Sequence, residues 1–347
     1  DYTLQNEISG KFSTGPIEHH ALLGTELSYA KFEYELASGA ESTIDLFNPV
    51  YNHVLDRNIP HVPFEGTSNK AVGIYLQDQV TLTSQLKLLV GVRYDYVESK
   101  ENYSTVFKHN DSAFSPRVGL VYQPVEPVSL FAGWSRSFNP NFGASQAGGG
   151  FDPEEGEQFE GGIKLELVKD RLFSTLAYYD ITKQNVLTPD PNNVNFSILT
   201  GEQKSRGFEY DLIGTPMPGW NVVASYAYTD AFVSADNSIP VGRPLPAVPS
   251  HQAGLWTSYE IQGGSLKGFG VGAGVYYMDD RPATLPGNGV SLPSYWRFDA
   301  AVFYRRDNWS AQVNFKNIGD EKIYQSQGYL ITPDAPFNVQ ASITYRF

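Results

Sequence analysis

The sequence lacks cysteine altogether and contains only two methionines among its 347 residues. Without cysteine, the chain can form neither disulfides nor a thiolate metal site. No apolar run approaches the roughly 18 residues that a membrane-spanning helix needs, so a helical membrane protein is excluded. Basic residues are also scarce, with 25 Lys and Arg against 38 Asp and Glu. The net charge of −13 argues against a nucleic-acid-binding protein, which needs clustered cations to neutralise phosphates.

Aromatic residues and glycine are plentiful instead, with 22 Tyr, 21 Phe, 5 Trp and 32 Gly. Aromatic side chains suit the pleated surface of a sheet. Apolar residues recur at every second position in many segments, whereas helical spacing is absent almost everywhere. We therefore predict about fifteen strands, at residues 3–12, 20–34, 72–82, 85–97, 115–122, 128–138, 157–168, 171–183, 203–213, 220–230, 251–261, 268–278, 294–305, 308–317 and 338–347.

Short turns and long connections alternate along the whole chain. Tight turns of Pro, Asp, Gly or Asn type are predicted at residues 123–126, 168–171, 215–218 and 305–308. Longer connections are predicted at residues 36–70, 99–114, 139–155, 184–195, 231–250, 279–293 and 319–337. A transmembrane β-barrel shows this alternation, with short turns on the periplasmic side and long loops outside. The alternative is a soluble β-sandwich or propeller, which has no reason to alternate so regularly.

The last three predicted strands separate apolar from charged side chains. The face that includes Trp296, Val302 and Phe347 carries no charged residue, whereas the opposite face carries five. An Arg or Lys that faces lipid at the membrane midplane costs about 2–4 kcal/mol, so a barrel wall must keep its charges on one face. The apolar face also has aromatic residues near its strand ends, as is typical of rings at the headgroup level. These are Trp220, Tyr226, Tyr228, Trp296, Tyr304, Trp309 and Tyr345.

Glycine occupies every second position from Gly268 to Gly274. The spacing of two, with no helical pattern after it, makes a dinucleotide-binding loop a weak interpretation. Glycines on one face of a strand are predicted to leave room for something packed inside the barrel.

Several short motifs in a fixed order resemble the family of TonB-dependent outer-membrane receptors. The order is similar to that of the siderophore-receptor branch, especially receptors of the ferrichrome (hydroxamate) type, and Phe347 resembles the terminal barrel-assembly signal of the family. The motifs lie at residues 46–50 (Leu-Phe-Asn-Pro-Val), 114–119 (Phe-Ser-Pro-Arg-Val-Gly), 135–140 (Ser-Arg-Ser-Phe-Asn-Pro), 156–160 (Gly-Glu-Gln-Phe-Glu), 206–209 (Arg-Gly-Phe-Glu), 225–231 (Ser-Tyr-Ala-Tyr-Thr-Asp-Ala), 299–300 (Asp-Ala), 317–324 (Asn-Ile-Gly-Asp-Glu-Lys-Ile-Tyr) and 345–347 (Tyr-Arg-Phe).

The resemblance implies an all-β fold, a transmembrane antiparallel β-barrel in the cell outer membrane. Family members have an N-terminal plug with a TonB box and a barrel of about 22 strands. We therefore expect residues 1–347 to be the C-terminal part of the barrel, without the plug and about seven strands. The opening residues 1–4 are not a signal peptide, so we expect any export signal to lie outside the chain.

The implied function is the binding of a ferric hydroxamate siderophore at extracellular loops and its import with TonB-coupled energy. The expected partners are the siderophore, the TonB–ExbB–ExbD complex acting through the missing N-terminal part, outer-membrane lipid and the barrel assembly machinery, with no nucleic acid. No resident cofactor and no protein metal site are expected. The alternatives are a receptor for haem or another scarce nutrient, and a passive porin.

Aromatic loop residues are the candidates for siderophore contact, because aromatic side chains give contact area to a fairly apolar ligand. They are Phe47, Tyr51, Phe142, Phe151, Tyr329 and Phe337. The alternative for each is packing against neighbouring loops. His53 and His61 lie in the longest predicted loop, where a haem receptor would place an axial ligand. The alternative for both is a solvated loop histidine.

Charged residues on the predicted inner face could be interpreted as paired catalytic carboxylates, but a lumen network that contacts water and the plug is the preferred interpretation. They are Arg93, Asp95, Lys164, Glu166, Glu209, Asp211, Arg297 and Asp299. No Ser/His/Asp constellation and no His-Glu-x-x-His zinc motif stands out. We therefore expect that the protein is not an enzyme.

Overall fold

A single large antiparallel sheet dominates the computed structural model, which describes residues 1–37, 61–102, 106–141, 150–190, 192–285, 289–326 and 330–347. Fifteen strands form this sheet, and each is hydrogen-bonded to the sheet strands before and after it in the chain. They are β1 (Tyr2–Thr14), β2 (Ile17–Ala37), β3 (His61–Thr81), β4 (Leu86–Asn102), β5 (Val106–Val125), β6 (Val128–Asn139), β7 (Glu154–Val168), β8 (Leu172–Asp190), β9 (Asn193–Met217), β10 (Trp220–Ala235), β11 (His251–Glu260), β12 (Phe269–Met278), β15 (Tyr295–Arg306), β16 (Trp309–Lys316) and β19 (Asn338–Tyr345).

Two small two-stranded sheets lie in the last two long connections. One pairs β13 (Arg281–Pro282) with β14 (Ser291–Leu292), and the other pairs β17 (Tyr324–Ser326) with β18 (Ile331–Pro333). No helix among the described residues is long and apolar enough to cross a membrane.

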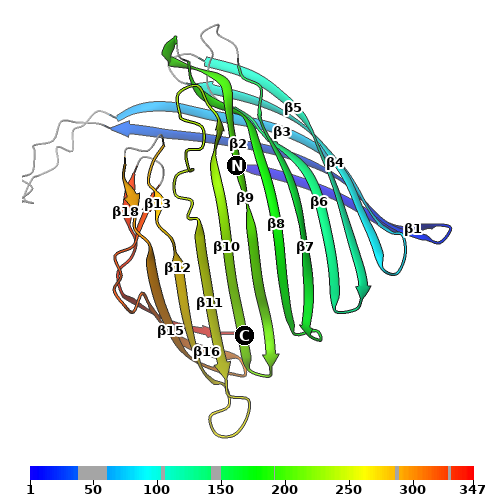
Figure 1. Ribbon diagram of the computed structural model, residues 1–347, viewed down its shortest axis with the longest axis vertical. Helices are drawn as coiled ribbons and strands as arrows, with labels where there is room; N and C mark the ends of the chain where they lie inside the picture. Colours follow the sequence, from blue (N-terminus) through cyan, green and yellow to red (C-terminus); the bar gives the residue numbers. More distant parts are fainter. Residues whose placement is uncertain (38–60, 103–105, 142–149, 191, 286–288, 327–329) are drawn as a thin grey trace, which may run out of the picture.

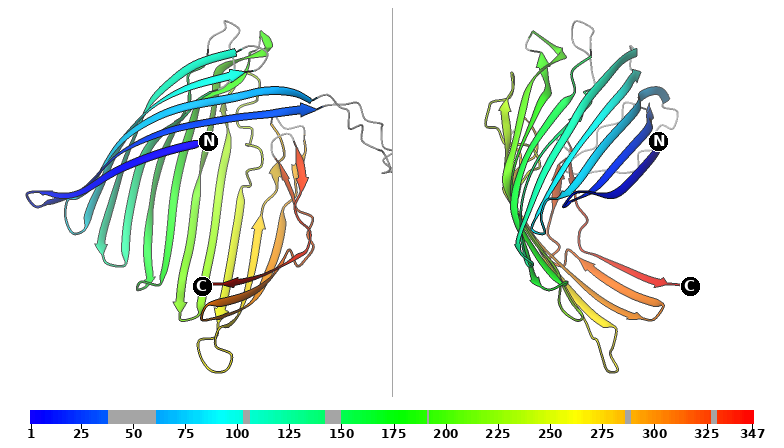
Figure 2. Two further views of the ribbon diagram at one scale, coloured as in Figure 1. Left: turned by 180° about the vertical axis from the view of Figure 1, so that it is seen from behind. Right: turned by 90° about the vertical axis from the view of Figure 1, so that its right-hand side faces the viewer.

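The large sheet curves into an open trough (Figures 1 and 2). Its two edges are β1 and β19, which do not pair with each other in the described part of the chain. The prediction of fifteen antiparallel strands is therefore confirmed. The trough has a concave inner wall and a convex outer surface, and successive side chains along each strand point to these two sides in turn.

The strand connections differ between the two ends of the trough. At one end the turns are short, and residues with positive φ close several of them, among them Gly15 (64°), Asp170 (58°), Gly219 (84°) and Asp307 (44°). Glycine adopts this conformation without steric cost, and Asp tolerates it better than most residues. The other end carries the longer connections, so it is called the loop end below.

Two of the predicted long connections are wrong, and the one predicted at residues 36–70 is too long, because β3 already begins at His61. The sequence predicts loops at residues 99–114 and 184–195, but β4 and β5 stay paired until Asn102 faces Val106. Strands β8 and β9 likewise stay paired until Asp190 faces Asn193. Polar residues dominate positions 99–105, and residues 189–193 (Pro-Asp-Pro-Asn-Asn) have the composition of a loop, so strand periodicity is weak there. Backbone pairing continues there without that signal.

The outer surface of the sheet is apolar, in contrast to the solvent-facing side of a sheet in a soluble protein. On β15, Phe298 and Val302 point outward and are 49% and 40% exposed. Between and beside them Asp299, Ala301 and Phe303 point inward and are buried. A water-soluble sheet hides its apolar face in a core. The predicted separation of the two faces is confirmed, and its direction fits a wall whose outside contacts lipid.

Stacked aromatic rings mark two levels on the outer surface. Near the loop end, Tyr277 packs on Trp296 with ring centres 4.7 Å apart, and near the turn end Tyr304 packs on Trp309 at 5.4 Å. Trp296 and Tyr304 are eight residues apart on β15, which corresponds to about 26 Å along the strand and to about 20 Å of height at the usual strand tilt of about 35–45°. An outer-membrane barrel has an apolar band about 25 Å tall between its aromatic girdles. The loop end therefore lies beyond the lipid.

The glycines of β12 do leave room, as the sequence predicts, and neighbouring aromatic rings of the same wall fill it. A Cβ atom added to Gly270 would lie 2.3 Å from the ring of Phe303, and one added to Gly272 would lie 2.7 Å from Trp256. The rings of β11 and β15 thus lie flat across β12. Only glycine allows this close approach.

Candidate functional site

Two strands on different sides of the trough carry the same Arg-aromatic-Asp pattern, at residues 93–95 (Arg-Tyr-Asp) and 297–299 (Arg-Phe-Asp). Because side chains alternate along a strand, the Arg and Asp of each pattern share the inner wall, and the aromatic residue faces outward. Each pattern therefore places one ion pair on the wall that would face a ligand passing through the barrel. The two pairs have different surroundings.

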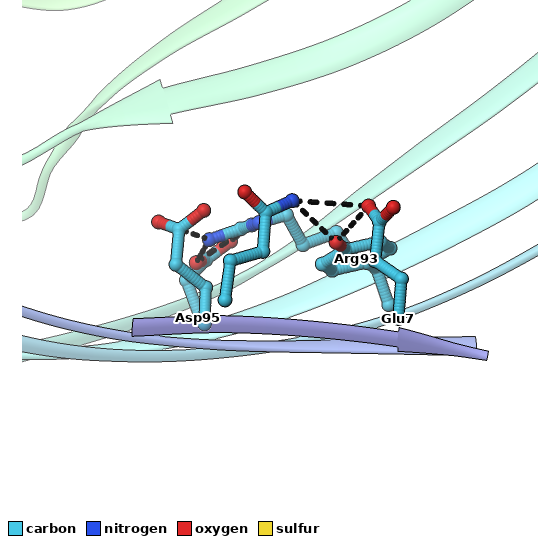
Figure 3. Close-up of polar contacts among 6 residues, drawn as sticks. Glu7, Arg93 and Asp95 are labelled. Atoms are coloured by element: carbon cyan, nitrogen blue, oxygen red, sulfur yellow. Dashed lines mark hydrogen bonds and ion pairs between the residues drawn. The ribbon is translucent and has the colours of Figure 1, made fainter. Parts of the chain in front are cut away.

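The first pair belongs to a cluster that spans β2 to β4 (Figure 3). Arg93 donates from Nε to both carboxylate oxygens of Asp95 at 2.8 Å, and its Nη2 donates to Glu26 at 3.2 Å. To reach Glu26, the guanidinium group crosses β3 above Gly73, where an added Cβ would lie 2.2 Å from Nη2. The glycine thus allows one arginine to bind two carboxylates, an arrangement in which charge-assisted hydrogen bonds are strong.

A second side chain that crosses a strand above a glycine extends the cluster to β1. The hydroxyl of Tyr75 donates to Glu7 at 2.6 Å and accepts from the side-chain amide of Gln5 at 2.8 Å. The ring crosses β2 above Gly24, and Arg93 lies 5.4 Å from the ring centre. Four strands are therefore joined by one polar network on the inner wall, and its central guanidinium group has two carboxylate partners.

The second pair lies in more open surroundings. Arg297 has its Nε 3.3 Å from Asp299, and its guanidinium group lies 4.5 Å from the ring centre of Tyr276. Gly274 makes room for Tyr276 and for Trp256, whose rings would lie 3.0 and 2.7 Å from an added Cβ. A cation over an aromatic face is stabilised by the ring quadrupole.

A hollow of about 530 Å³ opens beside this second pair. Its lining includes Glu209, Asp211, Ser225, Tyr276, Tyr295 and Arg297. The hollow thus combines aromatic faces with a few charged groups, which is the composition of a ligand site. Glu209, Asp211 and Arg297 were predicted as inner-wall charges from the sequence, and the structure brings them to this one hollow.

The motif at residues 317–324 builds the base of the last long connection. Asn317 is buried, and its backbone N–H donates to Asp299 at 2.9 Å. Its side chain both donates to the carbonyl and accepts from the N–H of Glu321, each at 2.9 Å. Asp320 then accepts the backbone N–H of Phe337 at 2.9 Å. These residues fix the loop on the end of the wall, so the motif has a positioning role.

A buried arginine that sequence reasoning missed joins the two small sheets at the loop end. Arg281 is 4% exposed, and its Nη2 donates to the carbonyl of Tyr324 at 2.7 Å. The hydroxyl of Ser326 donates to the carbonyl of Ala283 close by. The β13–β14 and β17–β18 hairpins therefore form one unit above the hollow. Its sequence neighbours Asp279 and Asp280 give no signal of this burial, because they suggest a solvated charged turn.

A second buried cluster lies at the loop end of β5. His109 and Asp111 have side chains 11% and 6% exposed, and Nε2 lies 3.4 Å from the carboxylate. Burial raises the pKa of Asp111, the neighbouring His109 opposes this shift, and Asp152 adds to it. The cluster lies beyond the aromatic girdle, outside the lipid.

The structure places two of the six predicted ligand-contacting aromatics. Phe151 is buried, which fits packing between loops, and Phe337 is half exposed directly before β19. They belong to different connections, before β7 and before β19, and the roles of both stay predictions. Phe47, Tyr51, Phe142 and Tyr329 lie outside the described residues.

The other predicted residues have simpler positions. His53 lies outside the described residues, and His61 begins β3. Phe347 ends the chain fully exposed beside Tyr345, with ring centres 5.1 Å apart. Its predicted role in barrel assembly stays a prediction.

Two further predicted inner-wall charges have local roles. Lys164 lies 5.6 Å from the ring centre of Phe173, and the carboxylate of Glu166 accepts the backbone N–H of Asp170 in the adjacent turn. No group of three or more His, Asp or Glu residues that could hold a metal ion occurs in the described residues. The chemistry that the wall offers is therefore hydrogen bonding, ion pairing and aromatic contact.

Comparison with protein families agrees with this architecture. Residues 1–318 match the family model described as TonB dependent receptor-like, beta-barrel. The metal-pseudopaline receptor CntO of Pseudomonas aeruginosa (strain UCBPP-PA14) is 33% identical over 370 residues, covering 100% of this chain and 51% of that protein. The ferrichrome outer membrane transporter/phage receptor of Escherichia coli (strain K12) is 31% identical, covering 88% of this chain and 42% of that protein.

Solved structures show the same fold. The siderophore receptor PiuA from Acinetobacter baumannii superposes with a TM-score of 0.82 at 24% identity, covering 99% of this chain and 55% of that one. The chain spans about half the length of the curated relatives it matches. It forms part of an outer-membrane β-barrel, and it belongs to the family of TonB-dependent receptors.

Proposed function

We propose that the protein binds a ferric siderophore, or a similar metal chelate, from outside the cell and imports it with energy from the TonB–ExbB–ExbD complex. The observation that supports this most is the match of residues 1–318 to the receptor barrel, together with relatives whose names specify metal-chelate receptors. The charged and aromatic inner wall fits the passage of a polar complex. A receptor that imports its ligand unchanged needs no catalytic group, so we propose that the protein is not an enzyme.

The complete protein is proposed to contain a plug domain with a TonB box and about seven more strands, closing a barrel of about 22. Two observations support this. The chain covers 51% of its relative CntO, and both sheet edges, β1 and β19, lack a partner strand in the described residues. An open edge in lipid leaves backbone N–H and C=O groups without hydrogen bonds, which no membrane-spanning sheet tolerates.

A hydroxamate siderophore is the proposed cargo within this class. Relatives named as receptors for ferrichrome (31% identical) and ferrioxamine B (30% identical) support it. The loop aromatics Phe47, Tyr51, Phe142, Phe151, Tyr329 and Phe337 are proposed to supply contact area at the extracellular side.

Growth tests with defined iron sources examine this proposal. The gene is deleted from its host, and growth is compared on a ferric trihydroxamate, a ferric catecholate and haem, with and without the gene restored. We expect the deletion to abolish growth on the trihydroxamate alone and the restored gene to recover it. Unchanged trihydroxamate growth with a defect on haem would instead assign the receptor to haem.

A further inference from the structure

Three lysines lie in one row on the outer surface of the sheet, across the neighbouring strands β2 to β5 (Figure 1). Lys31 on β2 is directly opposite Ser68 on β3, and Ser68 is directly opposite Lys100 on β4. Lys100 in turn is opposite Lys108 on β5. Lys100 follows the exposed, outward-facing Tyr96 by four residues, so this row points outward. These four residues are called the lysine row below.

The pairing of Lys100 with Lys108 is unfavourable by itself. Residues directly opposite each other in an antiparallel pair have Cβ atoms about 4.5–5.5 Å apart, and like charges in such positions destabilise the pair. Neither lysine forms an ion pair with a carboxylate in the described part of the chain. An anion that bound both of them would offset their repulsion.

The carboxylates around the lysine row already have partners. Glu33 forms an ion pair with Lys31, and Glu98 forms one with Lys70 at 3.4 Å. Asp1 accepts the backbone N–H of Lys31 at 3.2 Å. The surface thus has one lysine more than it has carboxylates, although the chain as a whole carries a net charge of −13. The surplus positive charge belongs to the β4–β5 pair.

A hollow of about 340 Å³ lies between Lys31 and Lys100, where the short side chain of Ser68 leaves room. Tyr29 also lines it, and Glu33 is its one acidic lining residue. Ammonium groups and hydroxyl groups are the donors that bind phosphate oxygens, and the bonds from charged donors are the stronger ones. The hollow therefore has the shape and the donors to hold a phosphate group.

The lysine row lies where lipid headgroups are expected. On β4, the outward-facing Tyr94 and Tyr96 come before Lys100, and the ring of Tyr94 packs on Phe114 of β5 at 4.8 Å. Aromatic rings on the outside of a barrel prefer the headgroup level. Lys100 lies about 13 Å along the strand beyond Tyr96, or about 10 Å of height at the usual tilt. A long lysine side chain can extend back to the headgroups from there.

We propose that the lysine row binds the phosphate group of an anionic lipid in the membrane leaflet at the loop end. Lys31 and Lys100 bind the phosphate in the hollow from two sides, Ser68 donates its hydroxyl hydrogen, and Lys108 adds a further positive charge. The acyl chains of this lipid lie against the apolar outer surface below. The site is on the opposite face of the wall from the passage, so it does not depend on which cargo the receptor imports. The bound phosphate stabilises the ends of β4 and β5.

Two matched lipids test the proposal. Phosphatidic acid carries a phosphate monoester, and diacylglycerol with the same acyl chains lacks it. Binding to the full-length receptor in neutral detergent is measured by native mass spectrometry for wild type, Lys100→Gln, Lys108→Gln and the double variant. Lys169→Gln is the control, since Lys169 is also exposed but is paired with Glu126 at 3.1 Å at the turn end. Inorganic phosphate is added as a competitor to distinguish a lipid site from a site for free phosphate.

We expect wild type to prefer phosphatidic acid, each single variant to bind it about fivefold more weakly and the double variant about 25-fold more weakly. Lys169→Gln should bind it like wild type, and diacylglycerol should bind to all variants alike. Inorganic phosphate should displace the lipid only in large excess. Equal binding of the two lipids by wild type, or unchanged affinity in the double variant, overturns the inference. Displacement by inorganic phosphate at equal concentration shows a free-phosphate site and overturns the assignment to lipid.

Thermal unfolding separates lipid binding from a purely structural role of the lysines. Without lipid, Lys108→Gln should unfold at a slightly higher temperature than wild type, because the repulsion from Lys100 is gone. Phosphatidic acid should then raise the midpoint of wild type more than that of the variant, since the variant has lost part of the site. An equal rise in both proteins would show that Lys108 does not contact the lipid phosphate and would contradict the proposal.

Discussion

The outer and inner surfaces of the same sheet follow different rules. Outward residues such as Phe298 and Val302 are exposed, apolar and without polar partners, because lipid asks only that they be hydrophobic. Inward residues such as Arg93 have defined hydrogen-bond partners, and glycines admit them. The outer surface therefore requires only that its side chains be apolar, whereas the inner wall requires particular residues at particular positions.

The arginines of the inner wall and of the loop end differ in their partners. Arg93 has two carboxylate partners, Asp95 and Glu26, and completes a closed network. Arg281 and Arg297 each retain a donor without an acceptor in the described residues. A satisfied network stabilises the wall, whereas a buried donor without an acceptor costs free energy.

We expect the largest difference in stability between a variant with a new arginine on the outer surface and a variant with a new arginine on the inner wall. Ala300 faces outward, midway between the rings of Trp296 and Tyr304, and Asn314 faces inward on the adjacent strand. Ala300→Arg should lower the free energy of unfolding in lipid vesicles by about 2–4 kcal/mol, because the charge meets lipid near the midplane. Asn314→Arg is the control and should lose less than half of that, measured by urea unfolding. Equal losses would mean that the surfaces are assigned wrongly.

Loss of the central arginine should weaken the inner wall next most. Arg93→Met leaves Asp95 and Glu26 without their shared partner, and we expect a loss of about 2 kcal/mol in the free energy of unfolding. Arg206→Met is the control. Its pair with Asp230 is 54% and 38% exposed, so its loss should be at most about 1 kcal/mol. If the two variants were equally stable, the network would not support the wall.

A methyl group added to a glycine should lower the free energy of unfolding by about 1 kcal/mol on the inner wall and leave it unchanged on the outer surface. Gly272→Ala brings its Cβ within 2.7 Å of Trp256 on the inner wall, whereas at Gly161 the nearest atom is 3.6 Å away. We therefore expect a lower thermal unfolding midpoint for Gly272→Ala and an unchanged one for Gly161→Ala. An unchanged midpoint in both would contradict close ring packing over β12.

The smallest expected effect is a pH dependence at the loop end of the inner wall. Burial raises the pKa of Asp111 in the folded protein, so the folded state binds a proton more tightly than the unfolded state. Stability should therefore fall as the pH rises from the ordinary carboxyl pKa to the raised one, and then level off. Asp111→Asn should flatten this slope and slightly raise stability at neutral pH. Thermal melting from about pH 3 to about pH 7, the range in which carboxyl groups titrate, measures this slope. If the variant kept the wild-type slope, the pH dependence would come from other groups.

The sequence predicts well whatever lipid dictates. Strand number, the separation of faces on β15 and the girdle residues Trp296 and Tyr304 all follow from alternation, because a membrane imposes it on every strand. The extensions of β4 and β8 were missed, since the polar residues at 99–105 and the Pro-Asp-Pro-Asn-Asn stretch at 189–193 are typical of loops.

The details of the inner wall were only partly predictable. The Arg-aromatic-Asp patterns identify Arg93 and Arg297 as inward charges, but not their partners on other strands. Glu26 joins Arg93 only because Gly73 lies between them, and Arg281 is buried only because two distant hairpins meet. Such contacts depend on strand register and loop packing, which a single sequence does not reveal.

The central claim is energy-coupled import of a metal chelate, and uptake of radioactive iron tests it most directly. Cells with and without the full-length protein are given a ⁵⁵Fe-labelled trihydroxamate, and uptake is followed before and after a protonophore collapses the proton gradient of the inner membrane. We predict saturable uptake that requires the protein and stops when the gradient is lost, while binding to the cell surface persists. Uptake that rises linearly with concentration and ignores the protonophore would contradict the account and identify a passive pore.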